Sequence, residues 1–276
     1  MQELRMEGKK VLVTGSGTGI GRGIALEFAR EGAAVALHYS HSAAGAETAV
    51  EEIKKAGGTA MAFKADFNDA LEARGLAEKA AGFLGGLDVL INNAGITMNQ
   101  PFLETTVEQF NTVFDVNIRA MFFCTQGAAT IMEKAGHGSV INIGSVHAFG
   151  ALVEHAVYAA SKAAITGFTR TLSVELIQKN IRVNSIASGW VLVENQRKVL
   201  GPEFDEKEVG QVLPSGFIGA PVDIARLAIF LASDESRFVV GQTILCDGGQ
   251  TTLLPCTPNF RTPMKERWGQ GYVPGR

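Results

Sequence analysis

The sequence predicts an α/β fold in which a doubly wound, parallel, seven-stranded sheet carries helices on both faces within a single domain. Two observations lead to this prediction. Short apolar runs alternate with helical stretches along the chain, and strands that alternate with helices pair in parallel through right-handed crossovers. The apolar runs are also nearly continuous, as expected for strands that are covered on both faces.

The elements follow in order from this alternation. Strands are expected at Lys10–Thr14, Ala34–Tyr39, Thr59–Lys64, Val89–Asn92, Ser139–Ile143, Arg182–Ile186 and Gln242–Asp247. Helices are expected at Gly19–Glu31 and Ala43–Ala56, and around 69–85, 107–134, 158–179 and 221–233. No linker or repeat interrupts the pattern before about Thr251. We therefore expect one domain over 1–250 and a C-terminal extension over 251–276, which is rich in Pro, Gly and Arg.

Composition narrows the class of protein. Hydrophobic residues make up 46% of the chain and charged residues 19%, which suits a globular protein with a sizeable core. The net charge of −3 offers no basic surface for nucleic acid. Cys124, Cys246 and Cys256 form no C-x-x-C pair or His/Cys cluster, so we expect no metal site and a cytoplasmic location. A polar N-terminus and the lack of a long apolar run predict neither a signal peptide nor a membrane span.

A glycine-rich turn lies between the first strand and the first helix. Glycines there permit close approach of the backbone to a diphosphate, and the helix N-terminus adds free N–H groups. In isolation the motif is equally compatible with a turn that binds nothing. The residues of this turn that we expect to contact a dinucleotide are Gly15, Ser16, Thr18, Gly19, Ile20 and Gly21.

The G-x-x-x-G-x-G spacing of this turn resembles the short-chain dehydrogenase/reductase family, and the resemblance covers about residues 8–250. Asn92-Asn93-Ala94-Gly95 looks like the NNAG segment of that family, and Asp66 stands where the family has an adenine-contacting Asp. The resemblance implies a Rossmann fold and a nicotinamide cofactor. It also implies a homotetramer with the helices near 107–134 and 158–179 at one interface. It adds to the cofactor contacts Asp66, Phe67, Asn93, Ala94 and Gly95.

Cofactor choice depends on the end of the second strand. An Asp or Glu there accepts from the ribose 2′-hydroxyl and repels a 2′-phosphate. Tyr39 stands at about that position, and Ser40, His41 and Ser42 could donate to a phosphate, although the loop contains no Arg or Lys. The sequence therefore favours NADP over NAD.

The catalytic prediction begins with Tyr158 and Lys162, which have the Y-x-x-x-K spacing that places two side chains on one helix face. Carbonyl reduction needs an acid near the substrate oxygen, and alcohol oxidation needs its conjugate base. A free phenol has a pKa of about 10, and a nearby lysine cation is expected to lower it. Both residues are also expected to contact the cofactor.

Two further residues match the family in order along the chain. Ser145 lies thirteen positions before Tyr158, and the resemblance implies that it holds the substrate oxygen. Asn117 matches the helix Asn that the family uses to anchor a water in a proton relay to the lysine. Each residue alone could be an ordinary strand end or a polar helix residue.

The resemblance to the family is lost in the segment after the sixth expected strand. The family usually has Pro-Gly and then a Thr, whereas this chain has Ser188-Gly189 and then Val193. Gly189 and Val191 are still expected beside the nicotinamide. A polar substrate loop is expected at about 190–215. Substrate contacts are expected from Ser145, Tyr158, His147, Glu154 and Trp190, of which His147 and Glu154 could equally be solvated loop residues.

The function predicted is hydride transfer between the cofactor and a carbonyl or secondary alcohol of a small polar molecule, such as a sugar, polyol or sugar acid. Two alternatives stay open: a 3-oxoacyl reductase for keto-esters or acyl-carrier substrates, and a nucleotide-sensing scaffold on the same fold. The presence of Tyr158 and Lys162 argues against the scaffold. Finally, Phe260, Trp268 and Tyr272 predict that the C-terminal extension docks on a subunit surface, such as a neighbour's substrate loop, and the alternative is a frayed chain end.

Overall fold

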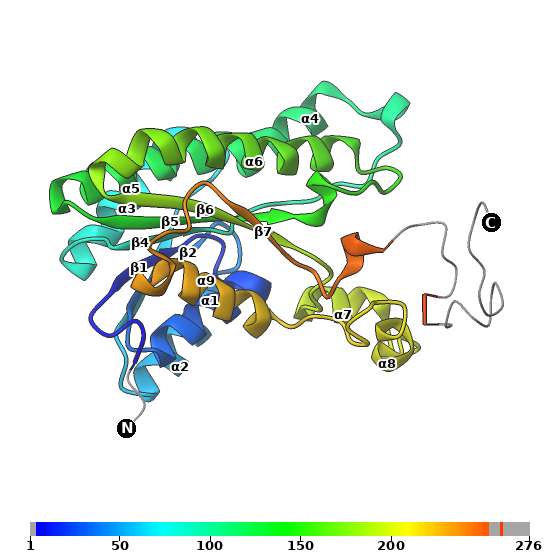
Figure 1. The fold of residues 1–276 in the computed structure, drawn as a ribbon, viewed down its shortest axis with the longest axis horizontal. Coiled ribbons are helices and arrows are strands. Elements are labelled where there is room, and N and C mark those ends of the chain that lie inside the picture. The colour runs from blue at the N-terminus through cyan, green and yellow to red at the C-terminus, as the bar shows by residue number, and fades with distance from the viewer. Residues whose placement is uncertain (1–3, 254–259, 262–276) are drawn as a thin grey trace, which may run out of the picture.

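A central parallel sheet of seven strands organises the chain (Figure 1). The computed structural model describes residues 4–253 and 260–261. The strands are β1 (Lys10–Val13), β2 (Ala34–Tyr39), β3 (Ala60–Lys64), β4 (Val89–Asn92), β5 (Gly138–Ser145), β6 (Ile181–Ser188) and β7 (Thr243–Cys246). They lie in the order β3-β2-β1-β4-β5-β6-β7, so the strand order reverses between β1 and β4. The predicted fold class is confirmed.

Helices cover both faces of this sheet (Figure 1). One face carries α1 (Gly19–Arg30), α2 (Ala43–Lys55) and α9 (Pro221–Ala232). The other carries α3 (Ala70–Leu84), α4 (Val107–Phe114), α5 (Ala120–Ala135) and α6 (Ala156–Leu176). Each face has its own apolar core: Ile24 and Phe28 of α1 pack in one, and Leu76 and Met132 in the other. Burial of apolar side chains in these two layers is the main force that holds the strands in place.

Three local differences from the sequence prediction bear on the site. The helix expected at 107–134 is interrupted by a π-helical turn at Asp115–Arg119. Strands β5 and β6 each run two residues further than expected, to Ser145 and Ser188. The loop expected at 190–215 contains two short helices, α7 (Glu194–Leu200) and α8 (Glu206–Gly210). Helices of one or two turns are too short to show a hydrophobic period, so the sequence pattern did not reveal them.

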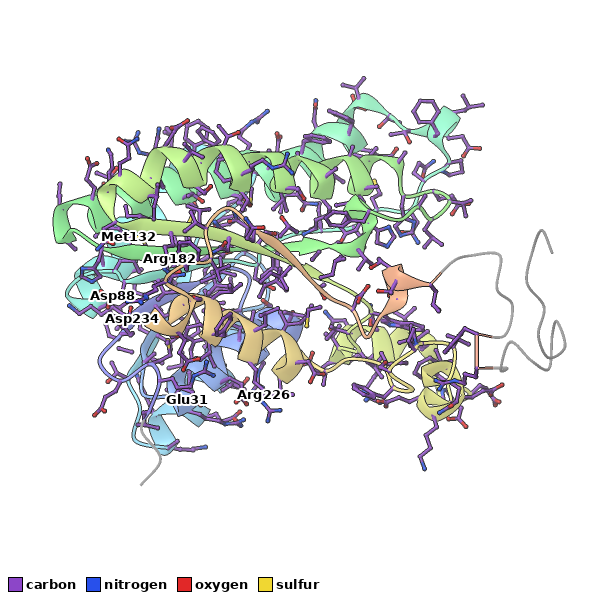
Figure 2. The ribbon with its side chains drawn as sticks, in the orientation of Figure 1. Glu31, Asp88, Met132, Arg182, Arg226 and Asp234 are labelled. Carbon is purple, nitrogen blue, oxygen red and sulfur yellow. The ribbon has the colours of Figure 1, made fainter. Side chains whose placement is uncertain are left out.

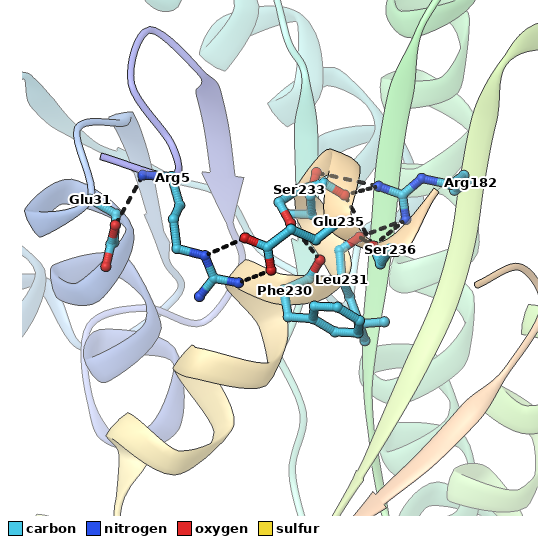
Figure 3. A network of polar contacts seen from close by, with 9 residues as sticks. Arg5, Glu31, Arg182, Phe230, Leu231, Ser233, Glu235 and Ser236 are labelled. Carbon is cyan, nitrogen blue, oxygen red and sulfur yellow. Dashed lines mark hydrogen bonds and ion pairs between the residues drawn. The ribbon is translucent and has the colours of Figure 1, made fainter. Parts of the chain in front are cut away.

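The amino ends of the strands are held by a polar network (Figure 3). The Arg182 guanidinium, at the start of β6, donates to the Leu231 and Ser233 carbonyls at 2.7 and 3.0 Å and so satisfies the last turn of α9. Arg5 forms an ion pair with Glu235 at 2.8 Å. Arg182 and Asp88 lie at the end of the molecule that points away from α7 and α8 (Figure 2). This leaves the carboxyl ends of the strands, where open α/β sheets bind their ligands, to form a site.

No helix within the described part of the chain has the length and apolar character needed to cross a membrane.

Candidate active site

A cavity of about 720 Å³ opens at the carboxyl ends of the strands, across the point where the strand order reverses. Segments that are distant in sequence meet in it: the turn after β1, the ends of β2 and β5, and the loops after β3, β4 and β6. The predicted site residues that line it are Gly15, Thr18, Gly19, Ile20, Tyr39, Ser40, His41, Ser42, Asp66, Phe67, Asn93, Ala94, Gly95, Ser145, His147, Tyr158, Lys162, Gly189, Trp190 and Val191.

Four predicted residues lie outside the set that lines the cavity: Ser16, Gly21, Asn117 and Glu154. Ser16 is fully buried, and its hydroxyl donates to the Val13 carbonyl at 2.8 Å. Glu154 has a positive φ of 64° and is exposed. Ser16 therefore shapes the turn from within, and Glu154 is exposed and does not line the cavity.

The glycine-rich turn is packed so closely that three of its glycines, Gly15, Gly17 and Gly21, have no room for a side chain, and two of these three press against the loop after β4. A Cβ on Gly15, which has a φ of +61°, would lie 2.8 Å from Ala94 Cα. A Cβ on Gly21 would lie 2.3 Å from the Asn93 amide nitrogen. The turn after β1 is thus pressed against the loop after β4, and its backbone forms one wall of the cavity.

The first amide of α1 already binds an anionic group. The Glu194 carboxylate, at the start of α7, accepts a hydrogen bond from Gly19 N at 3.0 Å. Gly19 has a φ of +58°, and Val193 lies beside it. A helix N-terminus favours negative charge through its free N–H groups and its dipole. This contact shows that the Gly19 N–H is free to donate a hydrogen bond to an anion, as diphosphate binding at this turn would require.

His38 at the end of β2 is a site residue that the sequence reasoning missed. Its Nδ1 accepts from Gly15 N at 3.0 Å, so its Nε2 carries the proton and donates to the Ala65 carbonyl at 3.1 Å. The ring stacks on Phe67 with centroids 4.1 Å apart. Burial lowers the pKa of His38 from 6.5 to about 4, with the hydrogen bond to Ala65 acting in the opposite direction. A neutral imidazole therefore fixes the glycine-rich turn.

At the β2–β3 end of the cavity, the structure adds a cation that the sequence did not suggest. Tyr39 pairs with Lys64 across these two strands. Lys64 and His41 line a small cleft together with Ser40, Asp66 and Glu72. The Ser40 hydroxyl donates to the Ala65 carbonyl at 2.8 Å. Strand register, rather than sequence distance, brings Lys64 next to the loop that appeared to lack a cation.

Ser145, Tyr158 and Lys162 come together at the β5–α6 side of the cavity. Lys162 is 6% exposed, and its Nζ donates to the Ile143 carbonyl at 3.1 Å and lies 5.6 Å from the centre of the Tyr158 ring. Burial lowers the pKa of Lys162 to about 8. Burial raises the pKa of Tyr158, and its hydrogen bond with Ser145 lowers it in part. The expected lowering of the phenol pKa by Lys162 is therefore wrong for this arrangement, because desolvation dominates.

Asn117 lies in the π-helical turn and forms hydrogen bonds with two segments next to Tyr158 and Lys162. Its amide oxygen accepts from Ile96 N at 2.8 Å, and its amide nitrogen donates to Ser161 Oγ at 3.0 Å. Asn117 thereby links the loop after β4 to α6, next to Lys162. A Cβ on Gly95 would lie 3.2 Å from the Asn117 amide oxygen and 3.5 Å from Lys162 Nζ, so all three residues are close neighbours.

Two histidines flank Tyr158, and only one of them was predicted from the sequence. The rings of His147 and His155 stack with centroids 4.9 Å apart, and both meet the Tyr158 ring at steep angles. Burial lowers the pKa of His147, and the charge of His155 adds to the effect. Other lining residues missed from the sequence include Asn68, Ile96, Thr97, Leu152, Gln196 and Gln250.

The predicted substrate loop closes this end of the cavity. The ring centroids of Trp190 and Phe204 lie 6.1 Å apart, and both residues pack against a small apolar cluster of Leu192 and Leu213, from the loop, and Ile218, which follows it. Arg261 donates to the Leu213 carbonyl at 2.9 Å, so this part of the C-terminal extension contacts the loop of its own chain. Trp268 and Tyr272 lie outside the described residues. In the part of the chain that the structure describes, no cluster of His, Cys, Asp or Glu could hold a metal ion.

Comparisons with known proteins agree with this geometry. Residues 15–251 match the family described as enoyl-(acyl carrier protein) reductase. An uncharacterized oxidoreductase of Methylorubrum extorquens is 40% identical over 247 residues, which cover 89% of this chain and 98% of the relative. The structure of a 7α-hydroxysteroid dehydrogenase with NADH and 7-oxo glycochenodeoxycholic acid is 36% identical, with a TM-score of 0.83 over 90% of this chain and 96% of that one. A protein of Beutenbergia cavernae described as an NAD(P)-dependent gluconate 5-dehydrogenase, with bound NADP, is 34% identical, with a TM-score of 0.83 over 91% of this chain and 100% of that one.

Proposed function

The chain belongs to the short-chain dehydrogenase/reductase family, and from that premise we propose that it reduces a carbonyl, or oxidises a secondary alcohol, of a small polar molecule with NADP as cofactor. The observation that carries the proposal is the meeting of Ser145, Tyr158 and Lys162 in one cavity with the glycine-rich turn. A bound nicotinamide would supply or accept the hydride. The protein then has to position the carbonyl and move one proton.

The proton chemistry falls to Tyr158. In reduction its phenol donates a proton to the carbonyl oxygen, and in oxidation the phenolate accepts it back. The Ser145 hydroxyl donates a hydrogen bond to the same oxygen and stabilises the charge that develops there. Because burial raises the pKa of Tyr158, the phenol is kept protonated, which suits the reductive direction.

Lys162 is the source from which Tyr158 regains its proton. Its pKa of about 8 means that it is charged at neutral pH but gives up a proton at small cost. Asn117 positions the loop after β4 against α6 through Ile96 and Ser161. In this role Asn117 acts through its neighbours.

The cofactor contacts are proposed from the geometry of the turn and the second strand. The Gly19 N–H, which donates to the Glu194 carboxylate, would donate to the diphosphate instead. Asn93, Ala94 and Gly95 line the cavity between this turn and Tyr158. NADP is favoured because Tyr39 stands where a repelling acid would be and because Lys64 and His41 lie beside it. Asp66 and Glu72 line the same cleft and would repel a 2′-phosphate, so the attraction from Lys64 and His41 has to exceed this repulsion.

The substrate class follows from the polar lining beyond Ser145, where His147, His155, Gln196 and Gln250 line the cavity. These side chains suit a sugar, polyol or sugar acid better than a long acyl chain. A 3-oxoacyl reductase stays the second candidate, because the matching family is described by an acyl-carrier activity. Reduction of keto-esters in preference to sugar substrates would support that candidate.

Three features of the whole protein are proposed together. We infer a homotetramer, because Phe110, Phe122 and Val174 leave apolar surface exposed on α4, α5 and α6. We infer a cytoplasmic location, because Cys124 and Cys246 are free thiols. We also retain the division into an oxidoreductase domain over 1–250, with its substrate loop at about 190–215, and an extension over 251–276.

The test is a panel of sugars, polyols, sugar acids and keto-esters, assayed with each nicotinamide nucleotide by the absorbance of the reduced cofactor. The proposal predicts turnover of a polar carbonyl or alcohol and a higher kcat/KM with NADPH than with NADH. Binding of nucleotide without turnover of any compound would favour a nucleotide-sensing scaffold instead.

A further inference from the structure

The cavity carries an asymmetry of charge that the proposed reaction does not use. Among the described residues that line it, the one carboxylate is Asp66, which follows the edge strand β3. The lining residues near β5 and α6 include His147, His155 and Lys162, and no acid. The part of the cavity that would receive the substrate therefore has only groups that are neutral or positive.

Hydrogen bonding settles which ring atom each histidine can offer a ligand. His155 Nδ1 lies 2.8 Å from the Val153 carbonyl, and a carbonyl can only accept, so Nδ1 carries a proton. His147 Nδ1 is buried and has no hydrogen-bond partner among the described residues. Its proton is therefore better placed on Nε2. In both histidines Nε2 is the nitrogen that remains for a ligand.

The two rings are also placed so that they would act on the same group. They stack 4.9 Å apart, and their centroids lie 5.4 and 6.2 Å from that of the Tyr158 ring. His147 lies in the short 3₁₀ turn Val146–Ala148 that follows β5, and His155 is the residue before α6, so regular elements hold both. Protonation of one ring beside the other is unfavourable unless an anion lies near both rings, at the edges that carry their Nε2 atoms.

We propose that His147 and His155 bind a carboxylate of the substrate, which makes the substrate a small oxo or hydroxy acid whose carboxylate lies close to the reacting carbon. This inference rests on the proposed function and narrows its substrate class. His147 donates from Nε2, and His155 as an imidazolium donates from Nε2 to the same carboxylate. Charge-assisted hydrogen bonds of this kind are about twice as strong as neutral ones.

The test compares each acid with its own methyl ester, which keeps the carbonyl and removes the charge. Suitable pairs are acetoacetate and methyl acetoacetate, levulinate and methyl levulinate, and a keto sugar acid and its methyl ester. The wild type should prefer the acid in at least one pair. His147→Phe and His155→Phe keep an aromatic ring against Tyr158 but remove the nitrogens. Each should lower the ratio of acid to ester kcat/KM by about tenfold or more, as expected for a lost hydrogen bond to a charged group.

Two controls make the ratio interpretable. His155→Gln keeps one donor and should restore part of the preference for the acid. His137→Gln removes a histidine that precedes β5 at the other end of the sheet and should leave the ratio unchanged. The dissociation constant of NADPH, measured by fluorescence, shows that each variant is folded. A preference for the ester in every pair, or an unchanged ratio in both Phe variants, overturns the proposal.

Failure of the proposed function would be recognised separately. If the wild type binds NADPH but turns over none of the compounds, the hydride-transfer reaction is wrong for these substrates. Ligand-observed NMR of levulinate with the enzyme and NADP then still decides the carboxylate site. Binding that is lost in His147→Phe and His155→Phe supports the site, and binding that is equal in wild type and variants, or absent from the wild type, contradicts it.

Discussion

Both ring nitrogens of His38 form hydrogen bonds with the backbone. The glycine-rich turn is therefore held by a side chain whose hydrogen bonds depend on its protonation state. The neutral ring accepts from Gly15 N and donates to Ala65. Protonation of His38 Nδ1 would turn this acceptor into a donor that faces the Gly15 N–H, so their hydrogen bond would be lost. Because the pKa of His38 is about 4 in the folded chain and 6.5 ordinarily, the unfolded chain binds more protons between these values. Stability that His38 contributes is therefore present above pH 6.5 and is lost as the pH falls toward 4.

This titration can be measured by urea denaturation between pH 7 and pH 4. His38 alone should account for a loss on the order of 3 kcal/mol in the free energy of unfolding over that range. His38→Gln should be less stable at pH 7 but should lose less stability on acidification. Equal pH dependence in the two proteins would mean that His38 titrates normally in the folded state.

Tyr39 is the residue at which cofactor preference should be switchable. Tyr39→Asp places a carboxylate at the end of β2, where it repels a 2′-phosphate and accepts from a 2′-hydroxyl. The ratio of kcat/KM with NADPH to that with NADH should fall about tenfold or more, which corresponds to about 1.4 kcal/mol. Tyr39→Phe serves as the control without charge. A wild type that already prefers NADH strongly would contradict the phosphate site beside His41 and Lys64.

Residue by residue, motif spacing predicted the parts of the site that are close in sequence. The spacing of Tyr158 and Lys162 placed both in the cavity, and the glycine spacing placed Gly15 and Gly19 there. Spacing could not predict Lys64, whose neighbour Tyr39 is set by the register of β2 and β3. Nor could it predict the raised pKa of Tyr158, because desolvation depends on the whole fold.

At the scale of elements, α7 and α1 meet through Glu194 and Gly19. The carboxylate lies at the amide that a diphosphate would need, so the two anions would compete. Glu194→Gln should therefore lower the dissociation constant of NADPH by about two- to fivefold, as expected for a charge at a helix N-terminus. Fluorescence titration measures it. Glu203→Gln removes a charge from the same loop and should change nothing. Equal or weaker binding in Glu194→Gln would show that the carboxylate does not compete.

Some helices and strands could be predicted from the sequence, and others could not. The strands β1 to β7 were found because apolar runs of four or more residues bounded by turns stand out in the sequence. The π-helical turn at Asp115–Arg119 was not, because its residues fit a helical period on either side. It matters for function, because it places Asn117 where it reaches both Ile96 and Ser161.

At the scale of the whole molecule, the C-terminal extension is expected to support the substrate loop. Arg261 holds the Leu213 carbonyl, and Leu213 belongs to the apolar cluster beneath Trp190. Truncation after Thr252 should raise KM for the substrate or break the oligomer, while the dissociation constant of NADPH stays the same. Arg261→Ala tests the loop contact alone and should raise KM without a change in oligomer size. Unchanged kinetics and assembly in both variants would show that the extension has no part in the site.

The central claim is that the half-buried phenol of Tyr158 moves the proton that accompanies hydride transfer. The most direct measurement is kcat and NADPH binding in Tyr158→Phe, with a substrate that the wild type turns over. The account predicts a loss in kcat on the order of a thousandfold or more, because an acid/base group and a polar contact to the reacting oxygen are removed together, with little change in the NADPH dissociation constant. Near-normal turnover in Tyr158→Phe would contradict it.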